Sequence, residues 1–223
     1  MTADQEGATR PRILLFFDYT CVFCYLDDGR FDRLARDYDV EIVRVPFELR
    51  PDIPDAGISA REHGLEHSDK VEAHIQRVAA QEGLPYSPVD HIPKTHKAMV
   101  MAEVARDEGI HPAVHKAIFR AYFGEGADIG SESVLLRIAE DEGLDTEEVV
   151  EAWSSGRYRE RLHAFRHLAD DLGVTATPAA LICNELMIGS RPYGTIRDAV
   201  ERCLLTEANI ERAAEARGAD ASE

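Results

Sequence analysis

Apolar residues follow two different periods along this chain, and the change of period divides it into three stretches. The first begins at Arg12–Phe17, which is apolar at almost every position and predicts a central strand covered on both faces. The β-branched run Glu41–Phe47 predicts a second strand. Between the two, apolar residues recur at helical spacing: Leu26, Phe31, Leu34, Ala35 and Tyr38. A strand, a helix and a strand within about 35 residues form a βαβ unit with parallel strands.

The second stretch has a helical pattern throughout. A proline-punctuated loop runs from Leu49 to about Gly57, and the residues beyond it show helical periodicity interrupted by glycines, with no segment typical of a strand. Pro112 fits the first turn of one helix, and Asp145 followed by Glu148 is an N-cap signature for another. Residues 58–155 are therefore predicted to be an all-helical insertion, forming a lid or a second lobe.

The third stretch returns to a mixed pattern. A long amphipathic helix ends at Gly173, and the apolar runs Ala179–Cys183 and Leu186–Ile188 are separated by a tight connection that predicts a hairpin. A last helix begins near Ile196. The fold class expected is α/β, with residues 12–57 and 156–210 forming one domain around the insertion and residues 1–11 and 211–223 forming flexible tails.

Cys21 and Cys24 form the most informative chemical motif, because they lie where the first strand gives way to the first helix. A thiol just before a helix faces free N–H groups and the positive end of the helix dipole, which favour the thiolate. This context favours a redox pair in which Cys21 is the exposed nucleophile and Cys24 resolves the mixed disulfide. The alternatives are half of a zinc site or two buried small residues.

Charge narrows the function classes. The formal net charge is −17 for 223 residues, which argues against binding to nucleic acid or an anionic membrane. Only four lysines are present, at positions 70, 94, 97 and 116, so the surface resembles that of proteins from a salt-loaded cytoplasm; an ordinary acidic protein is the alternative. The polar N-terminal residues lack an apolar secretory core, and no apolar stretch approaches the ~20 residues of a membrane span. The expected location is the cytoplasm.

Other histidines and cysteines suggest weaker possibilities. The run His63–His67 matches the zinc-protease pattern H-x-x-E-H, but Gly64 weakens the helix that this pattern needs, so a polar helix is expected instead. His163 and His167 are expected on a helix surface. Cys183 and Cys203 are interpreted as buried free cysteines, with Cys183 as an auxiliary thiol in the alternative. No metal and no cofactor is expected.

A second motif, Thr177-Pro178, stands immediately before the hairpin. Together with the C-x-x-C motif of Cys21 and Cys24, it favours one particular fold. A βαβ unit with C-x-x-C at its helix start, followed by a hairpin entered through Thr-Pro and a helix, resembles the thioredoxin fold. The helical insertion makes the chain more similar to the DsbA family. The stretches FDYTCVFCY, PFELRPDIPDAG and AIFRAYFGEGADIGSESVLLRIAEDEGLD resemble the FrnE-like branch of that family.

The resemblance implies a thioredoxin-like fold and a protein disulfide oxidoreductase whose catalytic residues are Cys21 and Cys24. It also implies a cis Thr177–Pro178 bond beside the dithiol, and a substrate groove that includes Thr177, Pro178, Val22, Phe23 and Tyr25. Val22-Phe23 stands where the family's Pro-Trp is expected, which leaves potential and partner choice open. Protein disulfides, dithiols or small thiols such as glutathione are the expected partners.

Two alternatives remain. One is a glutathione-dependent isomerase or transferase of small aromatic substrates on the same scaffold. The relatives with those activities carry serine at the nucleophile position, as the resemblance implies, so Cys21 favours disulfide chemistry. The other is a redox-inert binding module with a structural C-x-x-C.

Overall fold

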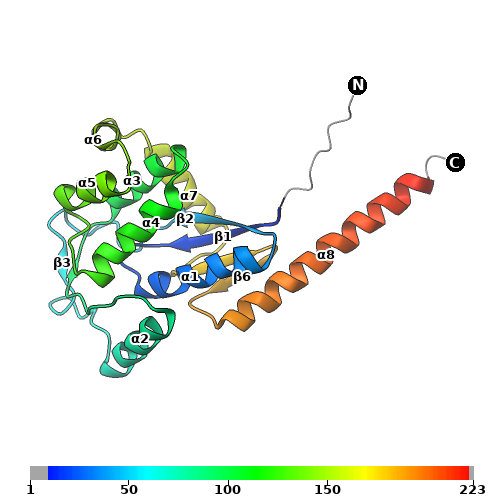
Figure 1. The fold of residues 1–223 in the computed structure, drawn as a ribbon, viewed down its shortest axis with the longest axis horizontal. Coiled ribbons are helices and arrows are strands. Elements are labelled where there is room, and N and C mark those ends of the chain that lie inside the picture. Colours follow the sequence, from blue (N-terminus) through cyan, green and yellow to red (C-terminus); the bar gives the residue numbers. More distant parts are fainter. Residues whose placement is uncertain (1–9, 221–223) are drawn as a thin grey trace.

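A four-stranded mixed sheet lies at the centre of the molecule, in the order β2-β1-β5-β6 (Figure 1). The computed structural model describes residues 10–220, and the side chains of residues 10–206. The strands are β1 (Arg12–Phe17), β2 (Glu41–Pro46), β5 (Ala179–Ile182) and β6 (Glu185–Ile188). β1 is parallel to β2 and antiparallel to β5, which pairs with β6 as a hairpin. The α/β class and the thioredoxin-like fold are confirmed.

Helices cover both faces of this sheet. On one face, α1 (Val22–Asp37) and α8 (Tyr193–Asp220) bury Ile13 and Leu15 of β1. On the other face, α7 (Arg159–Asp171) packs against Phe16 and its neighbours. Successive residues of a strand point to opposite faces, so a strand covered on both sides is apolar on both, as β1 is from Ile13 to Phe17.

The helical insertion packs at one end of the sheet, on the left of Figure 1. Its helices are α2 (Asp69–Glu82), α3 (His96–Asp107), α4 (His111–Phe119), α5 (Glu132–Asp141) and α6 (Thr146–Ser155), with a π-helical turn η1 (Arg120–Gly124) after α4. Pro112 lies in the first turn of α4, and the Asp145 carboxylate accepts a hydrogen bond of 2.8 Å from the backbone N–H of Glu147. Both predicted helix starts are therefore confirmed.

Two expectations about secondary structure need correction. β3 (Ile58–Ser59) and β4 (His91–Ile92) pair as a small antiparallel sheet inside the region predicted to be wholly helical. Strands of two residues are too short to show an alternating pattern. In addition, α8 continues to Asp220, past residue 211 where a tail was predicted. The predicted tails at residues 1–9 and 221–223 lie outside the described residues.

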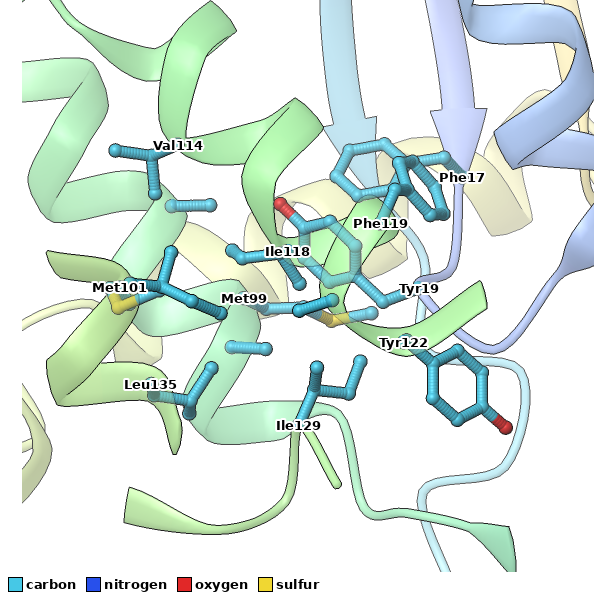
Figure 2. Close-up of a cluster of buried hydrophobic side chains, with 14 of the residues drawn as sticks. Phe17, Tyr19, Met99, Met101, Val114, Ile118, Phe119, Tyr122, Ile129 and Leu135 are labelled. Carbon is cyan, nitrogen blue, oxygen red and sulfur yellow. The ribbon is translucent and has the colours of Figure 1, made fainter. Parts of the chain in front are cut away.

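The largest hydrophobic cluster joins the insertion to the turn that carries the dithiol. Figure 2 shows Phe17 and Tyr19, at the end of β1, lying among side chains of the insertion. The ring centroid of Tyr19 lies 5.0 Å from that of Phe17 and 5.0 Å from that of Phe119 on α4. Aromatic rings at such spacing pack favourably beyond simple burial. The insertion thus holds the β1–α1 turn in place.

Cys183 and Cys203 form a disulfide, with a Cα–Cα distance of 5.9 Å. It links the turn of the β5–β6 hairpin to α8. The interpretation of these residues as free cysteines was wrong, as was the alternative of Cys183 as an auxiliary thiol. Their 20-residue separation carries no diagnostic spacing, so only the packing of α8 on the sheet brings the two sulfurs together.

Within residues 10–220, no helix combines the length and the apolar character needed to cross a membrane.

Candidate active site

Cys21 is the N-cap residue of α1, and Cys24 lies in the first turn of that helix. Cys21 has extended backbone angles (φ −90°, ψ 105°), and its carbonyl oxygen accepts hydrogen bonds from the N–H groups of Cys24 (3.0 Å) and Tyr25 (3.3 Å). The strand–turn–helix setting predicted for the motif is therefore present. Both cysteines are free thiols in this structure.

The side chain of Cys21 is less exposed than the sequence suggested. The residue is 9% exposed and Cys24 is 4% exposed, because both belong to the hydrophobic cluster shared with the insertion. The expectation that Cys21 is exposed was wrong, because its thiol lies at the edge of a buried cluster. Cys21 remains the more accessible of the two.

The Thr177–Pro178 loop lies directly against Cys21. The Cys21 thiol donates a hydrogen bond of 3.2 Å to the carbonyl oxygen of Thr177, and the Thr177–Pro178 bond is cis, as the family resemblance implied. The Pro178 carbonyl accepts a 2.7 Å hydrogen bond from the N–H of Gly189, which ties the loop to the end of β6. The buried hydroxyl oxygen of Thr177 has no hydrogen-bond partner in the described part of the chain.

The two thiols are electrostatically different. The pKa of Cys21 is lowered, first by a hydrogen bond from the Cys24 side chain and then by Thr177 and the Cys24 backbone N–H, which together outweigh burial. The pKa of Cys24 is raised well above its usual value by burial and by the neighbouring Cys21. A thiol with a lowered pKa is the nucleophile of such a pair, and its neighbour stays protonated until it is needed.

A cavity of about 380 Å³ opens beside the dithiol turn. Thr20 and Val22, which flank Cys21 in the sequence, form part of its wall, and Tyr122 and Phe123 of η1 contribute aromatic side chains. A group bound in this cavity would lie next to the two residues that flank Cys21.

Comparison with protein-family models identifies the fold of this site. The model described as the DSBA-like thioredoxin domain matches residues 12–201 of this chain, which is most of its length. The chain belongs to the DsbA-like thioredoxin domain family. Among curated proteins, the uncharacterized protein YwbO of Bacillus subtilis (strain 168) is 25% identical over 181 residues, covering 80% of this chain and 90% of YwbO.

Three solved structures share the fold of this DsbA-like chain. The probable DsbA oxidoreductase SCO1869 from Streptomyces coelicolor has a TM-score of 0.77 at 24% identity, covering 87% of this chain and 90% of its own. A 2-hydroxychromene-2-carboxylate isomerase has a TM-score of 0.69 at 22% identity, with 89% and 98% covered. The cytosolic disulfide reductase DsbM from Pseudomonas aeruginosa has a TM-score of 0.62 at 19% identity, with 89% and 99% covered. At these identities the likeness shows the fold alone.

The remaining residues predicted for the DsbA-like groove lie in different surroundings. Val22 borders the cavity, and Phe23 is half-buried, with its ring centroid 6.3 Å from that of His67. Tyr25 is 5% exposed, and its hydroxyl donates a 2.7 Å hydrogen bond to the Pro85 carbonyl oxygen. The side chain of Tyr25 therefore points toward the insertion. Tyr25 therefore anchors α1 to the insertion and does not face the cavity.

Of the histidines noted in the sequence, His67 lines the cavity beside the dithiol turn, and His163 and His167 lie on α7. The run His63–His67 falls in turns and irregular backbone between β3 and α2, so the helix expected there is absent and that expectation was wrong. His163 and His167 are exposed on α7, which confirms them as surface residues. Within the described residues, no group of three or more histidine, cysteine or acidic side chains is arranged to hold a metal ion.

Sequence reasoning missed two acidic residues beside the DsbA-like turn. Asp18 is 1% exposed, and its carboxylate accepts hydrogen bonds from the N–H groups of Thr20 (2.9 Å) and Leu49 (2.6 Å). Burial raises the pKa of Asp18 despite these bonds, and burial together with Asp18 raises the pKa of Glu48 to about 7. The available signal was an acidic residue directly after a buried strand, next to the dithiol.

A buried polar network was also missed. The Arg44 guanidinium donates a 2.7 Å hydrogen bond to Asp28 on α1, whose carboxylate lies 3.4 Å from His115 Nε2 on α4. The other ring nitrogen of His115 lies 3.1 Å from the Tyr19 hydroxyl. Burial alone would raise the pKa of Asp28, but His115 and Arg44 reverse this and lower it. The network links α1, β2 and α4 to the dithiol turn, and its signal in the sequence was Arg44, a charged residue between Val43 and Val45 in the middle of β2.

Proposed function

We propose that this protein is a thiol–disulfide oxidoreductase that acts through the redox dithiol Cys21-Val22-Phe23-Cys24. The observation that carries the proposal is the placement of the two thiols at the start of α1: Cys21 is the N-cap residue, with its sulfur 3.2 Å from the Thr177 carbonyl oxygen, and Cys24 is buried one turn further on. In keeping with this placement, the pKa of Cys21 is lowered and that of Cys24 is raised. A nucleophile and a protonated resolving thiol are the two groups that disulfide exchange needs.

The reaction follows from these roles. The Cys21 thiolate attacks one sulfur of a substrate disulfide, the substrate S–S bond breaks, and the other sulfur leaves as a thiolate. Cys24 then loses its proton and attacks the Cys21 sulfur, which releases the second substrate thiol and forms the Cys21–Cys24 disulfide. The substrate gains two electrons and the protein loses two, and the reverse sequence oxidises a dithiol.

The groove for the substrate is proposed to consist of Thr177, Pro178, Val22 and Phe23. The Thr177 carbonyl oxygen lies 3.2 Å from the Cys21 sulfur, so a chain bound against this loop would bring its sulfur to the nucleophile. Tyr25 is not included in the groove, because its side chain is buried against Pro85. Residues 12–57 and 156–210 are proposed to form the thioredoxin-like domain, with residues 58–155 as the insertion that borders the groove.

Glutathione is proposed as a small-thiol partner beside protein disulfides. The DsbM structure has also been solved with GSH, which supports this choice because DsbM shares the fold over most of both chains. The FrnE-like branch is proposed as the nearest group within the family, from the sequence stretches around the dithiol and in the insertion.

A second candidate is a glutathione-dependent isomerase or transferase of small aromatic substrates. The observation in its favour is the fold shared with 2-hydroxychromene-2-carboxylate isomerase. The free thiols of Cys21 and Cys24 favour disulfide exchange instead, because isomerisation needs no resolving thiol. Turnover of a hydroxychromene carboxylate with glutathione would support this second candidate.

The site of action is proposed to be the cytoplasm, as for DsbM, whose name describes it as cytosolic. The Cys183–Cys203 disulfide counts against a cytoplasmic location, since structural disulfides are rare in reducing compartments. Rapid acid quenching of cells followed by thiol labelling would measure the state of these two cysteines. Cell fractionation would locate the protein directly.

The proposed function is tested by trapping its intermediate. In Cys24→Ala the resolving thiol is absent, so mixed disulfides between Cys21 and its substrates should accumulate in cell extract and disappear on reduction. Cys21→Ser is the matched control, since it keeps Cys24 and removes the nucleophile. Equal amounts of captured protein in Cys24→Ala and Cys21→Ser would contradict the assignment of Cys21 as the nucleophile.

A further inference from the structure

The cavity beside the dithiol turn has two chemically different walls. Val22 lies on the α1 side, and Tyr122 and Phe123 lie on the η1 side, so apolar and aromatic surface lines much of the space. Arg50, in the loop that leaves β2, also lines the cavity and is half-buried. The cavity therefore combines apolar and aromatic surface with a cation, and its wall includes Thr20 and Val22, the two residues next to Cys21.

Most charged groups of the cavity already have partners in the protein. Arg61 pairs with Glu66 at 3.2 Å. The Glu72 carboxylate accepts a hydrogen bond of 3.1 Å from the Tyr86 hydroxyl. Asp90 accepts hydrogen bonds of 2.9 Å from the Ser59 hydroxyl and from the backbone N–H of Arg61. These groups balance one another and leave little capacity to hold a ligand charge.

Arg50 differs from all of them. Among the described residues, no carboxylate pairs with its guanidinium and no acceptor receives a hydrogen bond from it. The nearby Tyr122 hydroxyl is already used, since it donates a 3.0 Å hydrogen bond to the His91 carbonyl oxygen. A partly buried cation without a partner is costly, in a protein with 42 acidic residues available to pair with it. The N-terminus of α1, at Val22 in the same cavity wall, adds a second positive field.

We propose that Arg50 binds the carboxylate of a disulfide substrate whose apolar body fills the cavity between Val22 and the aromatic side chains of η1. The inference rests on the proposed function and adds a substrate class to it, namely disulfides that carry a carboxylate near the reacting sulfur. The planar guanidinium can donate two parallel hydrogen bonds to a carboxylate, which fixes orientation as well as charge. With its carboxylate on Arg50, the substrate presents its sulfur to Cys21.

The covalent step is the one already described. Cys21 thiolate attacks the sulfur bonded to the carboxylate-bearing half, the substrate S–S bond breaks, and the other half leaves as a thiolate. Cys24 then displaces the bound half as a second thiolate. Arg50 exchanges no proton and no electron, and it acts only by binding.

Two chromogenic disulfides of similar size test the role of the carboxylate. Dithiobis(nitrobenzoate) has a carboxylate on each aromatic ring, and dithiodipyridine has none; each releases an absorbing thiol when Cys21 attacks. Rate constants for both would be measured on the reduced full-length protein after subtraction of the rate with Cys21→Ser. The quantity of interest is the ratio of the rate constant for the carboxylate reagent to that for the neutral one.

Arg50→Gln should lower this ratio about tenfold, the loss expected for a hydrogen bond to a charged group. Arg50→Lys should give an intermediate ratio, because it keeps the charge and loses the fork. Arg36→Gln is the control for net charge: it removes one positive charge from the exposed far end of α1, about 20 Å from Val22 by the helix rise, and should leave the ratio unchanged.

An unchanged ratio in Arg50→Gln would overturn the proposal, and so would an equal fall in Arg36→Gln, which would trace the effect to net charge. In either case the reaction with dithiodipyridine would still report exchange at Cys21, so the proposed oxidoreductase function would stand. If neither reagent reacted with the wild-type protein faster than with Cys21→Ser, the oxidoreductase function would fail and the carboxylate site would fail with it.

Discussion

At the scale of single residues, the site depends on the balance between burial and hydrogen bonding at each sulfur: hydrogen bonds outweigh burial at Cys21, and burial outweighs them at Cys24. Cys21 lies before the free N–H groups of α1 and beside Thr177, whereas Cys24 is enclosed by the cluster shared with the insertion. Within the described part of the chain, the Thr177 hydroxyl has no hydrogen-bond partner when Cys21 is a thiol, since the thiol donates to the Thr177 carbonyl oxygen instead. When Cys21 loses its proton, that hydroxyl can donate to the thiolate and so lowers the pKa of Cys21.

Thr177→Val should therefore raise the pKa of Cys21 and slow its alkylation at neutral pH several-fold, because valine has the shape of threonine without the donor. Thr177→Ser keeps the hydroxyl and should retain the wild-type pH profile. Removing a buried hydroxyl that lacks a partner should not lower the free energy of unfolding of the reduced protein. The measurement is the rate of iodoacetamide labelling of Cys21 against pH. Identical profiles for Thr177→Val and wild type would exclude this role of the hydroxyl.

Asp27 is a buried acid whose contribution to stability can be tested by varying the pH. Its side chain is 2% exposed and accepts hydrogen bonds from Arg30 (2.6 Å) and Ser190 (2.8 Å), yet burial raises its pKa to about 6. Because this is above the unfolded value of ~3.9, folding favours the protonated carboxyl. The resulting stabilisation is complete below about pH 4 and is lost as the pH rises through 6.

Asp27→Asn should keep the neutral form at every pH. It should be more stable than wild type by roughly 2 kcal/mol at pH 8, with the difference shrinking between pH 6 and pH 4. Asp170→Asn removes the same charge from an exposed position on α7, so its effect should be small and nearly independent of pH. Urea unfolding at several pH values measures both variants. A wild-type protein more stable than Asp27→Asn at pH 8 would contradict the argument.

At the scale of secondary-structure elements, the sequence predicts those elements that are determined by a local pattern of residues. β1, α1, the β5–β6 hairpin and the caps of α4 and α6 follow from apolar period, proline and an N-cap aspartate, and the position of the dithiol at the start of α1 follows from them. β3, β4 and η1 are too short to have a period of their own.

What the sequence could not predict depends on contacts between distant segments. The Cys183–Cys203 disulfide requires that α8 return to the hairpin turn, and the network of Arg44, Asp28 and His115 requires that the insertion pack on α1 and β2. Arg50 illustrates the same limit for the site. In the sequence it is one arginine in a proline-rich loop, and only the folded cavity shows that none of the described side chains pairs with it.

The disulfide between the hairpin and α8 should contribute to stability through the loop it closes. A sequence separation of 20 residues corresponds to about 3 kcal/mol in the chain-entropy account. The double variant Cys183→Ser, Cys203→Ser should therefore have a free energy of unfolding lower than wild type by about this amount under non-oxidising conditions without reductant. Added reductant should bring wild type down to the level of the variant and leave the variant unchanged. Equal stabilities without reductant would show that the bond contributes nothing.

At the scale of the whole molecule, charge sets the response to salt. The chain has 42 aspartates and glutamates but only 25 lysines and arginines. Even if every lysine and arginine is paired, 17 negative charges remain. Self-repulsion among them destabilises the compact state and is screened by salt, since the Debye length falls from ~30 Å at 0.01 M to ~3 Å at 1 M.

The melting temperature should therefore rise as potassium chloride is added at neutral pH. The rise should largely vanish near pH 5, close to the isoelectric point of about 4.9, where the net charge is small. Thermal unfolding followed by circular dichroism at both pH values provides the measurement. A melting temperature that does not change with potassium chloride at neutral pH would favour an ordinary acidic protein over one adapted to high salt.

Redox titration would show whether Cys21 and Cys24 interconvert between a dithiol and a disulfide, which is the chemistry on which the proposed function depends. The protein would be equilibrated in a series of glutathione buffers, quenched with acid, alkylated and analysed by mass spectrometry to assign the state of each cysteine. We expect a single two-electron transition in which Cys21 and Cys24 become linked to each other, while Cys183 and Cys203 remain linked throughout that transition. If Cys21 and Cys24 remained thiols in the most oxidising buffer, the pair would not be a redox dithiol and the proposed function would be wrong.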